Sequence, residues 1–103
     1  MADPMRIRAS MSGDTVEVKI LMRHDMETGQ RKDASGKVVP AHYIKTLVAK
    51  AKDKVVFDAN FGPSVSKDPF LSFKFKGAAK GDKVSVTWVD SAGDTRTDEG
   101  IVS

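Results

Sequence analysis

The chain has 103 residues, of which 40% are hydrophobic and 30% are charged, and this length suits a single domain over residues 1–103. It contains no cysteine, which excludes disulfides, thiolate metal ligands and a thiol nucleophile. Seventeen basic and fourteen acidic residues give a formal net charge of +3. The two signs alternate, as in Lys80-Gly81-Asp82-Lys83, so we expect no basic stripe and no nucleic-acid partner.

Neither a membrane partner nor a secretory signal is predicted. No apolar run approaches the length of a membrane-spanning segment. The first residues, Met1-Ala2-Asp3-Pro4-Met5-Arg6, lack the apolar region of a secretory signal. Taken alone, these residues predict a cytoplasmic protein.

Apolar residues alternate with polar ones through most of the chain, which is typical of half-buried β-strands. In chain order the five apolar sets are Ile7, Ala9 and Met11; Val16, Val18, Ile20 and Met22; Val55, Phe57, Ala59 and Phe61; Leu71, Phe73 and Phe75; and Val84, Val86 and Trp88. A last strand is expected over residues 95–102. Residues 41–52 fit a helix or a strand. Short strands separated by turn residues predict an all-β sandwich of about seven strands.

Residues 23–40 form an insertion between two of these segments. Seven of the eighteen residues are charged, too many for a buried connection. A link of this length inside a compact domain usually forms a binding loop or a small element of its own. Asp33-Ala34-Ser35-Gly36-Lys37 is a good hairpin turn, with Gly36 available for positive φ. We therefore expect residues 30–32 to pair with Val38 and Val39.

A second irregular stretch covers residues 62–69. It contains two prolines, Pro63 and Pro69, and so cannot be a central strand. The two irregular stretches could share one end of the sandwich. Trp88 is expected in the core, whereas Phe70 is out of phase with its strand and is expected to be partly exposed.

Two candidate chemical sites involve His24. Met22, His24 and Met26 alternate on one strand face and combine thioether and imidazole groups, which suit Cu(I). Met22 also continues the core face of its strand, which favours a packing role. His24 and His42 with Asp25 could supply a base and its orienting carboxylate. No Gly-x-Ser-x-Gly or His-Glu-x-x-His motif is present, so we expect no enzymatic activity, a loop hydrogen-bonding role for His24 and an ordinary strand position for His42.

The irregular segments resemble the SoxZ family of sulfur-oxidation proteins. The resemblance extends over essentially the whole chain, with Asp25 as a departure where proline is often expected. Its motifs are Met26-Glu27-Thr28-Gly29-Gln30-Arg31-Lys32-Asp33, Gly36-Lys37-Val38-Val39-Pro40, Gly62-Pro63-Ser64-Val65-Ser66, Pro69-Phe70, the start Met1-Ala2-Asp3-Pro4, and Thr87-Trp88-Val89-Asp90 with Gly93-Asp94.

The resemblance implies an immunoglobulin-like β-sandwich, which favours a strand over residues 41–52. It also implies a non-catalytic subunit without cofactor that forms a heterodimer with SoxY, the chain that carries covalently bound sulfur on a C-terminal cysteine. The absence of cysteine here fits that role, since a second thiol would invite exchange. A periplasmic location, reached by co-export with the partner, and contacts with other Sox enzymes are further implications.

Twelve residues of the two irregular stretches are the predicted partner contacts: Arg23, His24, Met26, Glu27, Thr28, Gly29, Gly62, Pro63, Ser64, Val65, Ser66 and Pro69. The alternatives are a periplasmic copper-binding sandwich that uses Met22, His24 and Met26, and a generic protein-interaction domain.

Overall fold

A computed structural model describes residues 4–62, 65 and 67–103, and the predictions at Pro63, Ser64 and Ser66 lie outside these residues. Within them the chain forms seven strands and no helix, so no helix is available that is long and apolar enough to cross a membrane. The strands are β1 (Arg6–Ser12), β2 (Thr15–Leu21), β3 (Ile44–Ala51), β4 (Lys54–Asn60), β5 (Phe70–Lys76), β6 (Lys83–Asp90) and β7 (Thr95–Ile101).

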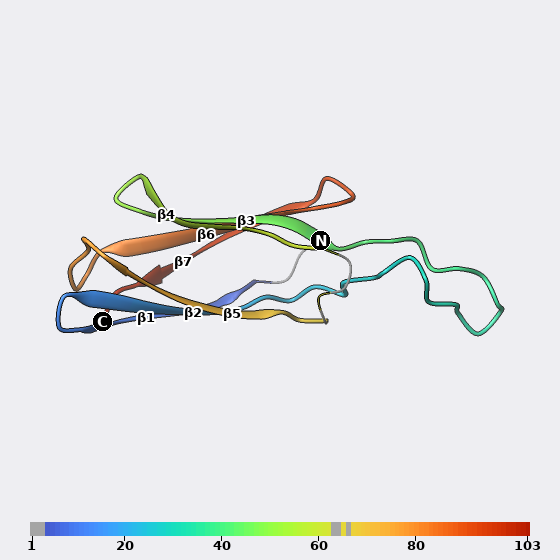
Figure 1. Cartoon of the computed structure of the whole chain (residues 1–103), viewed down its shortest axis with the longest axis horizontal. Helices are drawn as coiled ribbons and strands as arrows, with labels where there is room; N and C mark the ends of the chain where they lie inside the picture. Colours follow the sequence, from blue (N-terminus) through green and yellow to red (C-terminus); the bar gives the residue numbers. More distant parts are fainter. Residues whose placement is uncertain (1–3, 63–64, 66) are drawn as a thin grey trace.

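Two antiparallel sheets pack face to face, one with the order β1-β2-β5 and one with the order β4-β3-β6-β7 (Figure 1). The predicted immunoglobulin-like sandwich is confirmed. The segment that fitted helix or strand contains β3, in which Leu47, Ala49 and Ala51 point inward and are buried. Trp88 is buried in the core, as predicted, and Phe70 is 62% exposed.

One flank of the sandwich is closed by the end of the chain. After β7 the backbone passes to the other sheet, where Val102 bridges Ala9 in parallel orientation and Met11 N–H donates to Ser103 O at 3.0 Å. β7 crosses β1 closely at this flank, because a Cβ placed on Gly100 would lie 2.7 Å from Cγ2 of Ile7. A side chain does not fit at that position without movement of Ile7.

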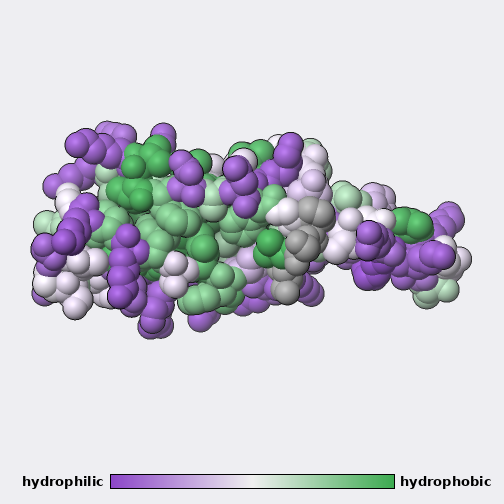
Figure 2. Space-filling view, viewed as in Figure 1, coloured by the Kyte–Doolittle hydropathy of each residue, from purple (hydrophilic) through white to green (hydrophobic). Residues whose placement is uncertain are grey.

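The other flank lies between β4 and β5, and no β-bridge joins these strands in the described part of the chain. The rings of Phe57 and Phe73 stack across it, with centroids 4.4 Å apart and planes 7° apart. Figure 2 shows hydrophobic surface between the two sheets on this side. The sandwich therefore has one sealed flank and one flank at which apolar side chains reach the surface.

One sequence prediction is wrong in detail. Val55 was expected to point inward with Phe57, but it is 54% exposed. The register shifts between Ala49 and Lys50, so that two residues of β4 oppose one of β3, and this β-bulge reverses the face on which Val55 lies.

The expectation that no basic surface forms is also wrong. Basic residues that alternate with apolar ones in β1 project together from the outer face of the β1-β2-β5 sheet, where β2 and β5 add more of them. Charges that are interleaved along the chain are thus separated by the pleat, since alternate residues of a strand share one face.

Candidate functional site

The insertion between β2 and β3 projects from one end of the sandwich as a long hairpin, which we call the arm and define as residues 23–43 (Figure 1). It accounts for much of the elongated shape, whose principal extents are 53 × 21 × 20 Å. Figure 2 shows a mostly hydrophilic surface along it. The predicted hairpin is confirmed: Lys32 bridges Val38, and Val39 N–H donates to Arg31 O at 2.7 Å.

The tip of the arm is organised by the carboxylate of Asp33. Its Oδ1 accepts hydrogen bonds from the Ser35 hydroxyl at 2.7 Å, the Ser35 N–H at 2.9 Å and the Lys37 N–H at 3.0 Å. The Ser35 hydroxyl and the Lys37 N–H are the main reasons why the pKa of Asp33 lies below its ordinary value. Gly36 has φ of 83°, as expected for the left-handed position of the turn.

The base of the arm is a second set of backbone contacts. Glu27 and His42 exchange both N–H···O bonds, at 2.7 and 3.0 Å, and so hold the two sides of the arm together. Gly29 has φ of 87°, and a Cβ built on it would lie 3.1 Å from the Cβ of Ala41. Glu27 also receives two hydrogen bonds from Nε and one from Nη2 of Arg31, and this contact is the main reason why its pKa is lowered.

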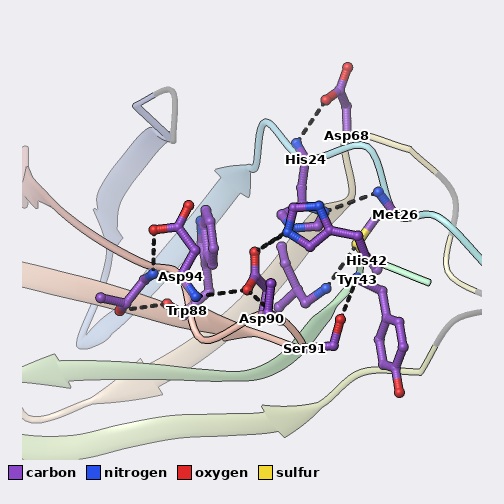
Figure 3. A network of polar contacts seen from close by, with 12 residues as sticks. His24, Met26, His42, Tyr43, Asp68, Trp88, Asp90, Ser91 and Asp94 are labelled. Carbon is purple, nitrogen blue, oxygen red and sulfur yellow. Dashed lines mark hydrogen bonds and ion pairs between the residues drawn. The ribbon is translucent and has the colours of Figure 1, made fainter. Parts of the chain in front are cut away.

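Both sides of the arm are tied to the body by one buried carboxylate, Asp90 (Figure 3). Asp90 is the last residue of β6, and its Oδ2 lies 3.0 Å from Nε2 of His24 and 2.7 Å from Nε2 of His42. Its Oδ1 accepts the N–H groups of Ala92 and Asp94 in the turn before β7. We call His24, His42 and Asp90 the anchor.

The anchor has a defined pattern of hydrogens. Met26 N–H donates to Nδ1 of His24 at 3.0 Å, so Nε2 of that ring carries its hydrogen and donates to Asp90. The His24 ring also packs edge to face on His42 and on Trp88, with centroids 4.7 and 5.2 Å away. Burial tends to raise the pKa of Asp90, but the hydrogen bonds from His24, the Asp94 N–H, His42 and the Ala92 N–H outweigh it and lower this pKa.

The ligand atoms of the anchor lie within 4.8 Å of one another, which is close enough to hold a metal ion. Metal binding through Nε2 of His24 would require the hydrogen on Nδ1, where it would face the Met26 N–H. The geometry therefore favours hydrogen bonding to Asp90 over metal binding. In the copper alternative, Met22 is fully buried in the core and the sulfur of Met26 accepts the Ile44 N–H at 3.3 Å. We therefore do not propose it.

The second irregular stretch lies beside the start of the arm. His24 N–H donates to the carboxylate of Asp68 at 3.0 Å, and Asp68 N–H donates to His24 O at 2.9 Å. Met22 N–H donates to Pro69 O at 2.9 Å, and Arg23 lies 3.8 Å from the Asp68 carboxylate. The two stretches therefore share one end of the sandwich.

The predicted contact residues fall into two groups. Arg23 and Thr28 are exposed, and Glu27, Gly29, Gly62 and Val65 are partly exposed. The other described members, His24, Met26 and Pro69, are buried. His24 and Met26 hold the arm to the body, whereas Pro69 accepts the N–H of Met22 just before the arm. Their role in partner binding stays a prediction.

Asp90 and the pairing of His42 with it were not predicted from the sequence, in which Asp25 was the candidate carboxylate. Asp25 is exposed, whereas Asp90 is 3% exposed. Asp90 is 66 residues from His24 and 48 from His42. One signal was available in the sequence. Asp90 follows the buried Trp88 by two residues in β6 and therefore points into the core, where a carboxylate needs hydrogen-bond partners.

Comparison with solved structures places the fold among small β-sandwiches. A superoxide reductase (neelaredoxin) from Ignicoccus hospitalis aligns with a TM-score of 0.63 and 11% identity, over 99% of this chain and 80% of that one. A variant of the superoxide reductase from Archaeoglobus fulgidus aligns with a TM-score of 0.62 and 19% identity, over 99% of this chain and 90% of that one. Another variant of that enzyme aligns with a TM-score of 0.56 and 20% identity, over 97% of this chain and 86% of that one. At these identities the likeness concerns the fold alone.

No match is found among curated proteins. The fold and the anchored arm define a single-domain immunoglobulin-like sandwich that carries a projecting hairpin. Residues 5–100 match the family described as sulphur oxidation protein SoxZ. The chain belongs to the SoxZ family and is thus a sulfur-oxidation protein.

Proposed function

We propose that this chain is the non-catalytic subunit of a SoxYZ-type sulfur carrier in thiosulfate oxidation. In this proposal the partner, a SoxY chain, carries the sulfur on its C-terminal cysteine, and the present chain binds that partner in the periplasm and helps to present the sulfur to Sox enzymes. Family membership supports the pathway. The absence of cysteine fits a subunit that must not exchange with the carrier thiol.

The observation that carries the proposal is the anchored arm. An exposed hairpin that both histidines tie to Asp90 is ordered before a partner arrives. Less conformational entropy is then lost on binding, which is the usual advantage of a preorganised interface. The arm and the adjacent stretch thus form a recognition surface made of polar contacts, with the chemistry on another chain.

A stable heterodimer also needs apolar contact, and commonly buries about 1,200–2,000 Å² in total. Near the base of the arm, Phe70 is paired with Leu21 across the β2–β5 ladder and is 62% exposed. Exposed aromatic residues are frequent energetic centres of interfaces. We infer that Phe70 is the apolar centre of the partner contact and that Arg23 and Thr28 lie at its polar rim.

Co-expression with a SoxY chain ending in Gly-Gly-Cys-Gly-Gly tests the proposal, with size-exclusion chromatography as the readout. The wild-type chains should coelute as a heterodimer, and Phe70→Ser should weaken the complex by about tenfold or more. Ile101→Ser is a matched control, because Ile101 is also 62% exposed but lies on β7, and should leave coelution intact. Independent elution of the wild-type chains would refute the proposal that this chain binds SoxY. If Phe70→Ser coelutes as well as wild type, Phe70 is not the centre of the contact.

A further inference from the structure

The outer face of the β1-β2-β5 sheet carries a concentration of positive charge, which we call the basic face. Five basic residues project from it, and Glu17 on β2 and Asp14 in the β1–β2 turn are its acidic residues. The basic residues are Arg6, Arg8, Lys19, Lys74 and Lys76. Their excess of three positive charges equals the formal net charge of the entire chain, +3, so the other residues sum to zero.

The register of the strands places like charges together. Arg8 is directly opposite Lys19 in the β1–β2 ladder, an arrangement that disfavours strand pairing. Lys19 and Lys76 lie 3.7 Å from Glu17 and Asp14, respectively. Arg6, Arg8 and Lys74 form no ion pair with any residue in the described part of the chain. The face therefore retains charge that its own carboxylates do not neutralise.

Two shallow grooves run over this face. One, of about 460 Å³, is lined by Arg8, Ser10, Glu17 and Lys19 together with residues at the β1–β7 flank. The other, of about 360 Å³, is lined by Ser10, Ser12, Thr15, Glu17 and Lys74. Both linings combine serine hydroxyls with long basic side chains, and Glu17 borders both grooves. Carboxylates of a docked protein would find hydroxyl and cationic donors in them.

We propose that the basic face is a docking surface for an acidic protein, separate from the arm. Charge complementarity identifies the partner, since a face with this excess favours a surface rich in Asp and Glu. A nucleic acid fits less well, because sheets that bind single strands present several aromatic side chains for stacking. Among the described outward residues of this sheet Phe70 is the only aromatic, and it lies at the end of β5.

Such a surface suits a transient contact. Exposed charges raise the rate of association more than the final affinity, and salt at physiological strength screens them within about 8 Å. A carrier that must be released after each encounter benefits from fast, weak docking. The inference does not require the arm to bind SoxY, because the experiment tests this chain without a SoxY partner. The basic face adjoins the proposed partner contact, since Arg6, Leu21 and Phe70 are paired in one row across the same sheet.

The experiment uses the chain itself and a fluorescent peptide of about twelve residues with alternating Glu and Ser. In extended form this probe presents carboxylates on one side at about 6.6–6.8 Å spacing, the repeat of alternate strand residues. We expect saturable binding that weakens at least about tenfold when NaCl rises from about 50 mM to about 250 mM.

The double variant Arg8→Glu with Lys19→Glu should weaken peptide binding by about tenfold or more. Its matched control is Lys50→Glu with Lys83→Glu, two exposed strand positions of the other sheet that change the net charge equally. This control should change the affinity less than about twofold. Equal losses in the two doubles, or tighter binding of an oligothymidylate of similar length than of the peptide, would overturn the proposal. Thermal denaturation verifies that all variants are folded.

Discussion

His24 donates from Nε2 to Asp90 Oδ2 over 3.0 Å, in a contact where both side chains are buried. This single bond connects the first residues of the arm to the end of β6, and His42 repeats the connection from the other side of the arm at 2.7 Å. One carboxylate thus ties both sides of the arm to the sandwich, and the hydrogen bonds between His24 and Asp68 add a second connection.

Asp90→Asn should be strongly destabilising. In either orientation the NH2 group of the amide would face donors, which are the N–H groups of Ala92 and Asp94 on one side and the His24 Nε2–H on the other. The His24 ring cannot change its tautomer while the Met26 N–H donates to Nδ1. Loss of a buried charged acceptor typically costs about 2–4 kcal/mol. Urea denaturation measures this. Asp25→Asn, at an exposed position of the same arm, is the control and should cost less than about 0.5 kcal/mol.

The free energy of unfolding should fall as the pH falls through the acid range. The folded pKa of Asp90 lies below its ordinary value of 3.8, so the contribution of this group is present above pH 3.8 and is lost as the pH falls through the lower folded pKa. The pKa of Asp98 is also lowered, chiefly by the side-chain hydrogen bond from Arg96. Denaturation midpoints between about pH 5 and pH 2 should show a flatter dependence in Asp90→Asn than in wild type. Identical slopes would contradict the assignment.

Gly29→Ala and Gly36→Ala should differ although both residues have positive φ. Each substitution should lower the free energy of unfolding by about 1 kcal/mol, because alanine is strained in the left-handed backbone conformation. At Gly29 the added Cβ would also approach the Cβ of Ala41 to 3.1 Å, whereas Gly36 has open space. Gly29→Ala should therefore be the more destabilising, and Ala41→Gly should restore part of the loss. Urea denaturation of the two single variants and the double variant tests this, and equal costs at the two glycines would contradict it.

Arg8→Glu should stabilise the free chain. The substitution replaces a like-charge pair with Lys19 by an opposite-charge pair, and direct cross-strand pairs of this kind contribute about 0.2–1 kcal/mol. Arg8→Gln removes the repulsion alone and should fall between wild type and Arg8→Glu. Thermal denaturation at low salt gives the order, and the differences should shrink as salt is added. A reversed order would show that Arg8 and Lys19 do not oppose each other.

The strands could be predicted from the sequence because each packs one face on a single core. A period of two is then imposed on the side chains, as in Val16, Val18 and Ile20, all of which are fully buried. The hairpin tip could be predicted because its determinants, Asp33 and Gly36, act within five residues. The burial pattern of a strand and the chemistry of a tight turn both involve residues that are close in sequence, and both can therefore be predicted.

Other features depend on pairing between distant strands, which the sequence does not display. The anchor joins residues up to 66 positions apart, so that neither histidine could be assigned to Asp90. The inversion of Val55 follows from a bulge between Ala49 and Lys50, for which β4 gives no glycine or proline signal. The basic face appears only once β1, β2 and β5 are placed side by side.

The double backbone exchange between Glu27 and His42 has a consequence for how this family could vary. Everything beyond that pair is a loop whose two ends already meet, so residues can be added or removed near the tip with a small closure cost. The part that reaches outward can therefore change in length and composition while the seven strands stay as they are. The sandwich can thus stay constant while the outer part of the arm is replaced.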